Sequence, residues 1–328
     1  MFYIERKRMV PFTSETKRII LAFESRIVSE IRYALNCLLI YSCSKHSPFY
    51  LENYRTMFND FKAYFLHLIH RLESTKYIVK MKDNFVDDNL IVKPEIEGLD
   101  PEEYTISTSE LLEQLKICLT IIRNFAMVKN NEAFLAKENK LKAVFVDLLL
   151  YNNESEINKL MLEIFAIISK YTILNVKENS RDKLFFQKII DSINSDYSEE
   201  YELGIENLHN LMMNQENETI LEHKLHTFIN QLVKFLISNS SDMIERVLEI
   251  ICHLSDLKIS TRVLLAKQMF LFTRLIALLA GSLEKNNEKI GKICVIILNN
   301  LMVTPATRAY LKYYEKDLFM IATSSELL

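Results

Sequence analysis

One short motif recurs along this chain and constrains its fold more than any other feature. In the copy at residues 119–125, an apolar residue is followed by a second one three positions later, then by Asn124 and directly by Phe125. Five further copies fill the same positions, and the equivalent of Asn124 falls at residues 40, 124, 167, 210, 253 and 300. The intervals are 84, 43, 43, 43 and 47 residues, and 84 is twice 42. Armadillo and HEAT repeats have periods of ~40–47 residues, so the spacing predicts stacked helical repeats.

The composition favours long helices over strands. The 328 residues include only 4 Gly and 5 Pro, which is too few turn residues for many short strands. Each repeat helix needs its neighbours to bury its apolar face, so the copies must share one continuous core. We therefore predict an all-α fold, an armadillo/HEAT-like right-handed α-solenoid of roughly seven helical repeats of about 43 residues. Because no segment resembles an interdomain linker, we expect residues 1–328 to form a single domain.

Apolar spacing and capping residues place the individual helices. Thr13 or Ser14 is expected to cap the first helix, and Pro305 is expected in the first turn of the last. Tyr and Phe residues at spacings of three and four predict a buried stripe in the third helix. The motif alignment predicts five core residues, namely Leu35, Ile122, Leu208, Ile251 and Leu298. The expected helices are 15–24, 27–44, 50–73, 107–129, 131–137, 139–151, 155–173, 180–194, 200–214, 217–238, 241–256, 259–280, 286–303 and 305–322.

An acidic insertion at about 74–106 interrupts the repeats. Between Asp83 and Glu103 there are eight acidic residues and a single base, Lys93. Two interpretations stay open: a solvated insertion without regular structure, or a docking segment for a basic partner. The short apolar runs 77–79 and 90–92 are compatible with a small hairpin.

The sequence holds no signal of catalysis or of a cofactor. It has no glycine-rich phosphate loop and no nucleophile motif. His67 and His70, like His223 and His226, are spaced as possible ligand pairs, but no further ligands lie near them in the sequence. We therefore expect no enzyme activity, no cofactor, no metal and no small-molecule substrate.

Charge and hydropathy exclude two further classes of partner. The net charge of -3 has no basic footprint, so we expect no direct nucleic-acid binding. The most apolar long window, 263–282, carries Lys267 and Arg274, so we expect a buried repeat helix and not a membrane span. Five scattered cysteines predict buried, reduced thiols in an intracellular protein, and the N-terminus has no secretory signal.

The polar position of the motif is a candidate for partner binding. It holds Asn124, Asn210 and Asn300, and Asn36 lies one helical turn before it in the first copy. Such asparagines either hydrogen-bond the backbone of an extended partner segment or bridge neighbouring repeats. Two arginines, Arg123 and Arg308, are candidate anchors for partner carboxylates, with structural ties as the alternative.

Three stretches resemble one protein family. In the first, Ala34, Leu35 and Asn36 follow Glu30 in residues 30–42, after a matching segment at 21–25. The second joins 119–125 to 131–135. The third combines 297–301 with Pro305, Arg308 and 314–318. Together they resemble the armadillo region of ARID-containing subunits of SWI/SNF-class chromatin remodellers (yeast type), although Tyr33 stands where many relatives have Trp.

This resemblance implies the C-terminal armadillo core of a longer subunit, without its DNA-binding domain. It implies a nuclear, non-catalytic scaffold that gathers a helix of the remodeller's ATPase subunit and other core scaffold subunits. The alternative is an unrelated armadillo/HEAT adaptor, such as a transport or trafficking scaffold.

Overall fold

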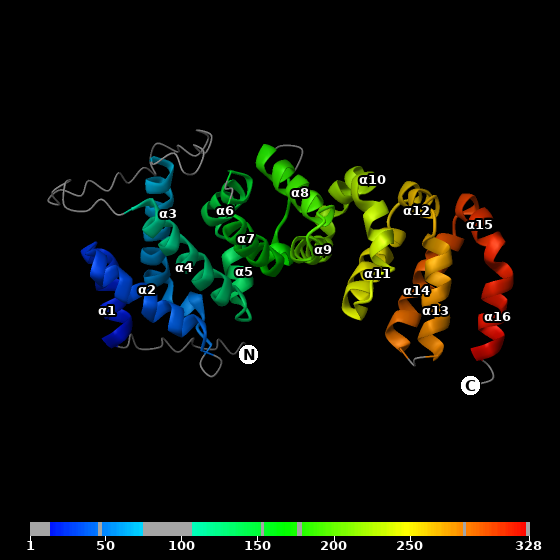
Figure 1. Cartoon of the computed structure of the whole chain (residues 1–328), viewed down its shortest axis with the longest axis horizontal. Helices are drawn as coiled ribbons and strands as arrows, with labels where there is room; N and C mark the ends of the chain where they lie inside the picture. The colour runs from blue at the N-terminus through cyan, green and yellow to red at the C-terminus, as the bar shows by residue number, and fades with distance from the viewer. Residues whose placement is uncertain are drawn as a thin grey trace, which may run out of the picture. The chain divides into compact units, whose positions relative to one another are not determined.

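A computed structural model describes residues 14–44, 48–74, 107–151, 154–175, 179–284 and 287–325 (Figure 1). These residues form helices and their connections, and none of them lies in a strand. The chain divides into two compact units, Met1–Ile168 and Ser169–Leu328. Residues 75–106 lie outside the described residues, and with them the acidic insertion and its two apolar runs.

The first unit contains seven α-helices among its described residues. A short 3-10 helix, η1 (Leu51–Tyr54), leads into the third of them. The α-helices are α1 (Ser14–Ser25), α2 (Val28–Ser42), α3 (Arg55–Ser74), α4 (Thr108–Ala126), α5 (Asn131–Ala136), α6 (Asn139–Tyr151) and α7 (Ser155–Ile168).

The described part of the second unit also consists of helices and their connections. Its elements are η2 (Ser169–Tyr171), α8 (Ser180–Ile193), α9 (Ser198–Met212), η3 (Gln215–Asn217), α10 (Glu218–Phe235), α11 (Ser241–Asp256), α12 (Ile259–Ala266), α13 (Leu271–Glu284), α14 (Glu288–Met302), α15 (Pro305–Leu311), η4 (Lys312–Tyr314) and α16 (Glu315–Ser325).

Side-chain hydroxyls cap the start of two helices, α4 and α11. The Ser107 hydroxyl accepts from the Glu110 amide at 3.2 Å, and the Ser240 hydroxyl accepts from the Met243 amide at 3.3 Å. Each cap satisfies one of the amides that a helix start leaves without an intrahelical partner. Pro305 occupies the first turn of α15, where its missing N–H is not needed.

The predicted core residues are buried. Leu35, Ile122, Leu208 and Ile251 are at most 1% exposed, and Leu298 is 5% exposed. The predicted aromatic stripe is confirmed as core at its Phe residues, while Tyr54 and Tyr64 are only half-buried. Phe58, Phe61 and Phe65 are each at most 1% exposed.

A buried asparagine fixes the same junction in both units. The Asn131 side-chain amide donates to the carbonyls of Phe49 and Phe125 at 2.7 and 2.9 Å, and its oxygen accepts from the Leu51 amide at 2.9 Å. All three partners are backbone groups close to a helix end, and the Phe125 carbonyl also accepts from the Val128 amide at 3.1 Å.

Asn217 makes the same three bonds in the second unit. Its amide donates to the carbonyls of Thr172 and Leu211 at 3.0 and 2.9 Å, and its oxygen accepts from the Leu174 amide at 2.9 Å. Asn131 and Asn217 are two periods of 43 residues apart, so the repeat seen in the apolar residues also governs the buried polar groups.

Two predicted helices are wrong because each is broken. The helix expected at 259–280 is α12 followed by α13, and Phe270 between them has a left-handed φ of 70°. The helix expected at 305–322 is α15, η4 and the first part of α16. No Gly or Pro marks either break, because the turns come from packing a short helix and a long helix against the preceding repeat.

Among the described residues, no single helix is long and apolar enough to cross a bilayer. The helices α12 and α13 have that length and composition only when taken together, and they are bent by 83°.

Candidate protein-interaction surface

The copies of the repeated motif form six helices, which we call the motif helices: α2, α4 and α7 in the first unit, and α9, α11 and α14 in the second. In the first unit α4 packs against both α2 and α7, and in the second α11 packs against both α9 and α14. Five of the six candidate partner-binding residues lie on these helices, while Arg308 lies on α15. We call the side of the motif helices that carries these exposed or half-buried polar side chains the polar face.

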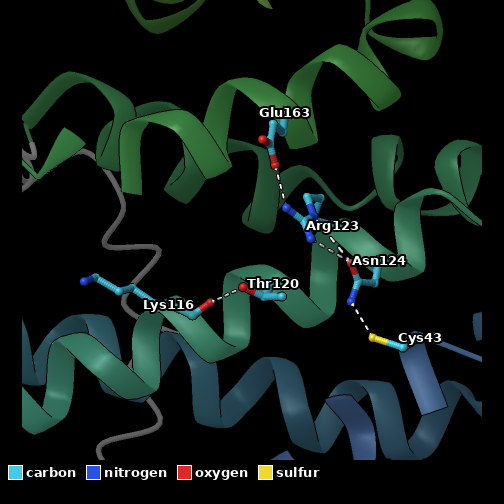
Figure 2. A network of polar contacts seen from close by, with 6 residues as sticks. All are labelled: Cys43, Lys116, Thr120, Arg123, Asn124 and Glu163. Atoms are coloured by element: carbon cyan, nitrogen blue, oxygen red, sulfur yellow. Dashed lines mark hydrogen bonds and ion pairs between the residues drawn. The ribbon is translucent and has the colours of Figure 1, made fainter. Parts of the chain in front are cut away.

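Arg123 and Asn124 connect α4 to the motif helices on either side of it (Figure 2). The Arg123 guanidinium donates to a Glu163 carboxylate oxygen on α7 at 2.8 Å and to the Asn124 side-chain oxygen at 3.2 Å. The Asn124 amide in turn donates to the Ser42 hydroxyl at 3.1 Å and to the Cys43 sulfur at 3.3 Å. Two consecutive residues thus join three repeats, and each side chain stays only partly buried.

Asn300 repeats the contact of Asn124 in the second unit. Its amide donates to the Ser255 hydroxyl at 3.0 Å, and Ser255 lies in the last turn of α11 as Ser42 lies in the last turn of α2. A third serine, Ser169, donates to the side-chain oxygen of Asn207 at 3.1 Å, while the candidate Asn210 lies half-buried one turn later on α9. The bridge between repeats therefore exists for Asn124 and Asn300, and their binding to a partner stays a prediction.

Asn36 is the exposed candidate among those on the motif helices, whereas Arg123, Asn124, Asn210 and Asn300 are half-buried. It lines a cavity of about 270 Å³ between α2 and α4, together with Arg32 and Glu110, which form an ion pair. Gln114 also lines the cavity, and the Tyr64 hydroxyl donates to its side-chain oxygen at 2.5 Å. Among the candidates on the motif helices, Asn36 is the one best placed to meet a partner.

Arg308 contacts the end of the preceding motif helix. Its Nε donates to the Met302 carbonyl at 3.1 Å. In the preceding repeat Arg262 does the same for α11, because its Nε donates to the Ser255 carbonyl at 2.8 Å. Both arginines supply donors to carbonyls that a helix end leaves unpaired. The structural tie is thus present for Arg308, as it is for Arg123, and the role of either residue as a partner anchor stays a prediction.

The sequence analysis missed a set of ion pairs between neighbouring motif helices. Their members are 40 residues apart, which is one repeat of about 43 residues less roughly one helical turn. Opposite charges at that spacing are therefore the signal that could have found them. The pairs are Lys116–Glu156 at 2.7 Å, Arg123–Glu163 at 2.8 Å, Arg246–Glu206 at 3.0 Å, His209–Glu249 at 2.8 Å and Lys289–Glu249 at 3.0 Å.

Three residues of these ion pairs, Lys116, Glu249 and Lys289, have shifted pKa values. Partial burial acts to raise the pKa of the Glu249 carboxyl, but the hydrogen bond from Lys289 and the charge of His209 outweigh it, so the pKa lies below its ordinary value. The hydrogen bond to Glu156 raises the pKa of the Lys116 amine, and those to Glu245 and Glu249 raise that of Lys289. All three groups are therefore charged at neutral pH, and the polar face is a pattern of fixed charges.

The cysteines correct one sequence expectation. Cys118 and Cys294 are buried, and burial raises the pKa of Cys118 far above its ordinary value and that of Cys294 to about 12. Cys43, however, is exposed, contrary to the prediction. It follows the last turn of α2, where the chain leaves the core.

Within the described residues no group of three His, Cys, Asp or Glu side chains is arranged to hold a metal ion. The paired histidines also lack a common environment. His67 is half-buried, and burial lowers its pKa, whereas His70 lies 3.6 Å from Glu73. The candidate residues on the motif helices can therefore form hydrogen bonds and ion pairs with a partner.

No protein-family model and no curated protein sequence matches this chain. Solved structures do match its fold. A computationally designed armadillo repeat protein for modular peptide recognition is 14% identical over 86% of this chain and 98% of its own, with a TM-score of 0.55. A designed armadillo repeat protein in complex with peptide (KR)4 is 15% identical over 88% of this chain and 100% of its own, with a TM-score of 0.56.

A further engineered protein is 13% identical over 93% of this chain and 61% of its own, with a TM-score of 0.57. At such identities the likeness concerns the fold alone. The fold is an all-α, armadillo-like solenoid of helical repeats, as the motif spacing predicted.

Proposed function

We propose that this chain is a non-catalytic scaffold that binds protein partners through the polar face of its motif helices. The observation that carries this proposal is the regular side-by-side packing of motif helices within each unit, with charged and amide side chains along their partly exposed faces. A repeated surface of this kind contacts a long helix or an extended segment at several points. Stable assemblies need about 2,000 Å² of buried area or more, so several partners or one long partner is expected.

We further propose that the assembly is a SWI/SNF-type chromatin remodelling complex, with the chain in the nucleus. The support is the resemblance in the three stretches described above. In the fold these stretches lie at α1 and α2, at α4 and α5, and from α14 to the start of α16. The proposed partners are a helix of the ATPase subunit and other core scaffold subunits.

Affinity purification of the full chain from nuclear extract, followed by mass spectrometry, tests the complex. A remodeller ATPase among the stably associated proteins is expected. Its absence, with a set of transport or trafficking proteins in its place, overturns the remodeller assignment and leaves a different armadillo adaptor.

The surface is tested separately by a charged substitution at an exposed position. Asn36→Arg places a bulky cation at the cavity between α2 and α4 and is expected to reduce partner recovery several-fold. The matched control is Asn230→Arg, because Asn230 is an exposed asparagine on α10, outside the motif helices. Equal recovery with both variants contradicts binding at this end of the polar face.

The combined variant Asn124→Ala, Asn210→Ala and Asn300→Ala tests the rest of the face. Since Asn124 and Asn300 bridge repeats, the thermal midpoint must be measured alongside partner recovery. If the variant melts as the wild type does and retains every partner, the polar face is not the binding surface.

A further inference from the structure

The last described motif helix exposes residues that the other motif helices bury. The first motif position is Val295 in α14, and its side chain is 52% exposed. The same position is 0% exposed in α4, α9 and α11, where it holds Leu119, Ile205 and Leu248. The residue type is equally apolar in all four helices, so the difference lies in what packs against them.

A second position two helical turns later behaves in the same way. Met302 on α14 is 41% exposed, whereas Met212 on α9 is 6% exposed and Ser255 on α11 is 0% exposed. Residues seven apart lie on the same side of a helix, and Asn299 between them is exposed as well. One whole side of α14 is therefore open.

The packing of the other motif helices explains the difference. Within the units, α2 is covered by α4, α4 by α7, α9 by α11, and α11 by α14. After α14 the described residues supply α15 and α16, which pack against α12 and α13 as the next repeat would, but no further motif helix.

Apolar residues of α16 are also more exposed than the equivalent residues of α13. Thr261 and Thr307 are equivalent buried residues 46 positions apart, so Phe272 and Leu275 on α13 correspond to Leu318 and Ile321 on α16. Phe272 is 4% exposed and Leu275 is 0% exposed, while both residues on α16 are only half-buried. We define the terminal face as Val295, Asn299, Met302, Leu318 and Ile321.

We propose that the terminal face binds an amphipathic helix of a partner protein, which takes the place of the next motif helix. This inference rests on the proposed scaffold function and names one surface for it. The repeat itself supports a helical occupant, because in α4, α9 and α11 the equivalent residues are buried and a following motif helix packs against each of these helices.

The charges around the terminal face specify the partner further. Lys292 stands three residues before Val295, as Lys116 stands three residues before Leu119. Lys116 pairs with Glu156 near the start of α7 at 2.7 Å, while Lys292 contacts only Glu288 of its own helix at 2.5 Å among the described residues. The partner helix should therefore carry an apolar stripe at spacings of three and four and a carboxylate near its first turn.

The chain itself provides a probe with these properties. A synthetic peptide of residues 154–171 contains the sequence of α7, with the motif and Glu156. Labelled with a fluorophore and titrated with the full chain, it is expected to bind saturably at one site and to gain helicity by circular dichroism.

Val295→Lys places a charge in the middle of the terminal face and is expected to weaken peptide binding at least ~10-fold. Since Val295 is already half exposed, the variant should fold. The matched control is Met269→Lys, because Met269 is 73% exposed in the turn between α12 and α13. The control variant should bind the peptide as the wild type does.

A charge exchange tests the orientation of the bound helix. Lys292→Glu in the chain is expected to weaken binding a few-fold, and a peptide carrying Glu156→Lys should recover the loss with that variant only. Recovery requires the two residues to face each other, which nonspecific apolar adsorption does not.

Three results overturn the inference. The first is the absence of saturable peptide binding. The second is binding that Val295→Lys does not weaken, which places the peptide elsewhere and leaves the scaffold function standing. The third is a dimer of the chain in analytical ultracentrifugation that Val295→Lys dissociates, because the occupant is then a second copy and not a partner. Failure of the scaffold function itself is recognised by the co-purification experiment.

Discussion

The motif helices of the two units pack in the same order but differ in charge. In the first unit α2, α4 and α7 carry five acidic residues and four Lys or Arg. In the second unit α9, α11 and α14 carry nine acidic residues and three Lys or Arg. Apolar burial and the backbone set the packing of these helices, so their charge is free to differ. A partner that reaches the second unit meets a more negative surface.

The feature that the two units share is a buried asparagine with the same hydrogen bonds. Asn131 and Asn217 bind equivalent backbone groups through three hydrogen bonds each, and both are at most 2% exposed. The ion pairs of the polar face have the same spacing of 40 residues in both units, but different residues form them. Arg123 meets Glu163 in the first unit, whereas His209 and Lys289 share Glu249 in the second. Buried polar groups are thus more uniform than exposed ones.

The largest expected effect tests this shared junction. Asn131→Ala and Asn217→Ala each remove three hydrogen bonds to backbone groups. One of the three acceptors, the carbonyl near the end of α4 or α9, keeps a second donor. The loss of a partner for a buried group costs ~1–3 kcal/mol, so the free energy of unfolding should fall by about 2–6 kcal/mol. Urea unfolding midpoints measure the loss, with Asn36→Ala as the exposed control. Losses that differ strongly between the two units would show that the junctions are not equivalent.

Core truncations should cost slightly less. Ile122→Ala in the first unit and Leu208→Ala in the second each leave a cavity, and we expect a loss of about 2–5 kcal/mol in the free energy of unfolding. Leu298→Ala should fall at the low end, because the open side of α14 allows the site to relax. Near-neutral unfolding midpoints for all three contradict the motif alignment.

The smallest effect concerns the partly exposed ion pairs, where the units differ. Removing the carboxylate with Glu163→Gln or Glu249→Gln should cost about 1 kcal/mol or less, since such pairs are screened by solvent. The folded-state pKa of Glu249 is lowered, so its contribution is present above the unfolded pKa of about 4.3 and is lost as the pH falls through the folded value.

Thermal midpoints of wild type and Glu249→Gln should therefore differ at pH 7 and converge as the pH falls below about 4. Glu202→Gln is a suitable control, because Glu202 is an exposed carboxylate on the same unit. A difference between wild type and Glu249→Gln that persists unchanged at pH 3 would falsify the role of the carboxylate charge.

The candidate site was only partly predictable. The repeat alignment found Asn124 and Asn300, but it left open whether they bridge repeats or bind a partner, since an amide can do either. The contacts to Ser42 and Ser255 depend on where the preceding helix ends. The ion pairs 40 residues apart were missed, because that spacing has meaning only once the helices are known to pack side by side.

The sequence by itself determined the helical class, the period and the inward side of each helix. These follow from apolar residues at spacings of three and four, which are a property of the chain within a few turns. Only the tertiary structure decided the break at Phe270 and the exposure of Val295. Val295 and Leu248 occupy the same motif position, yet one is 52% exposed and the other 0%. The burial of a side chain depends on whether another helix packs over it. The local apolar pattern is the same in both cases, so it does not show whether that helix is present.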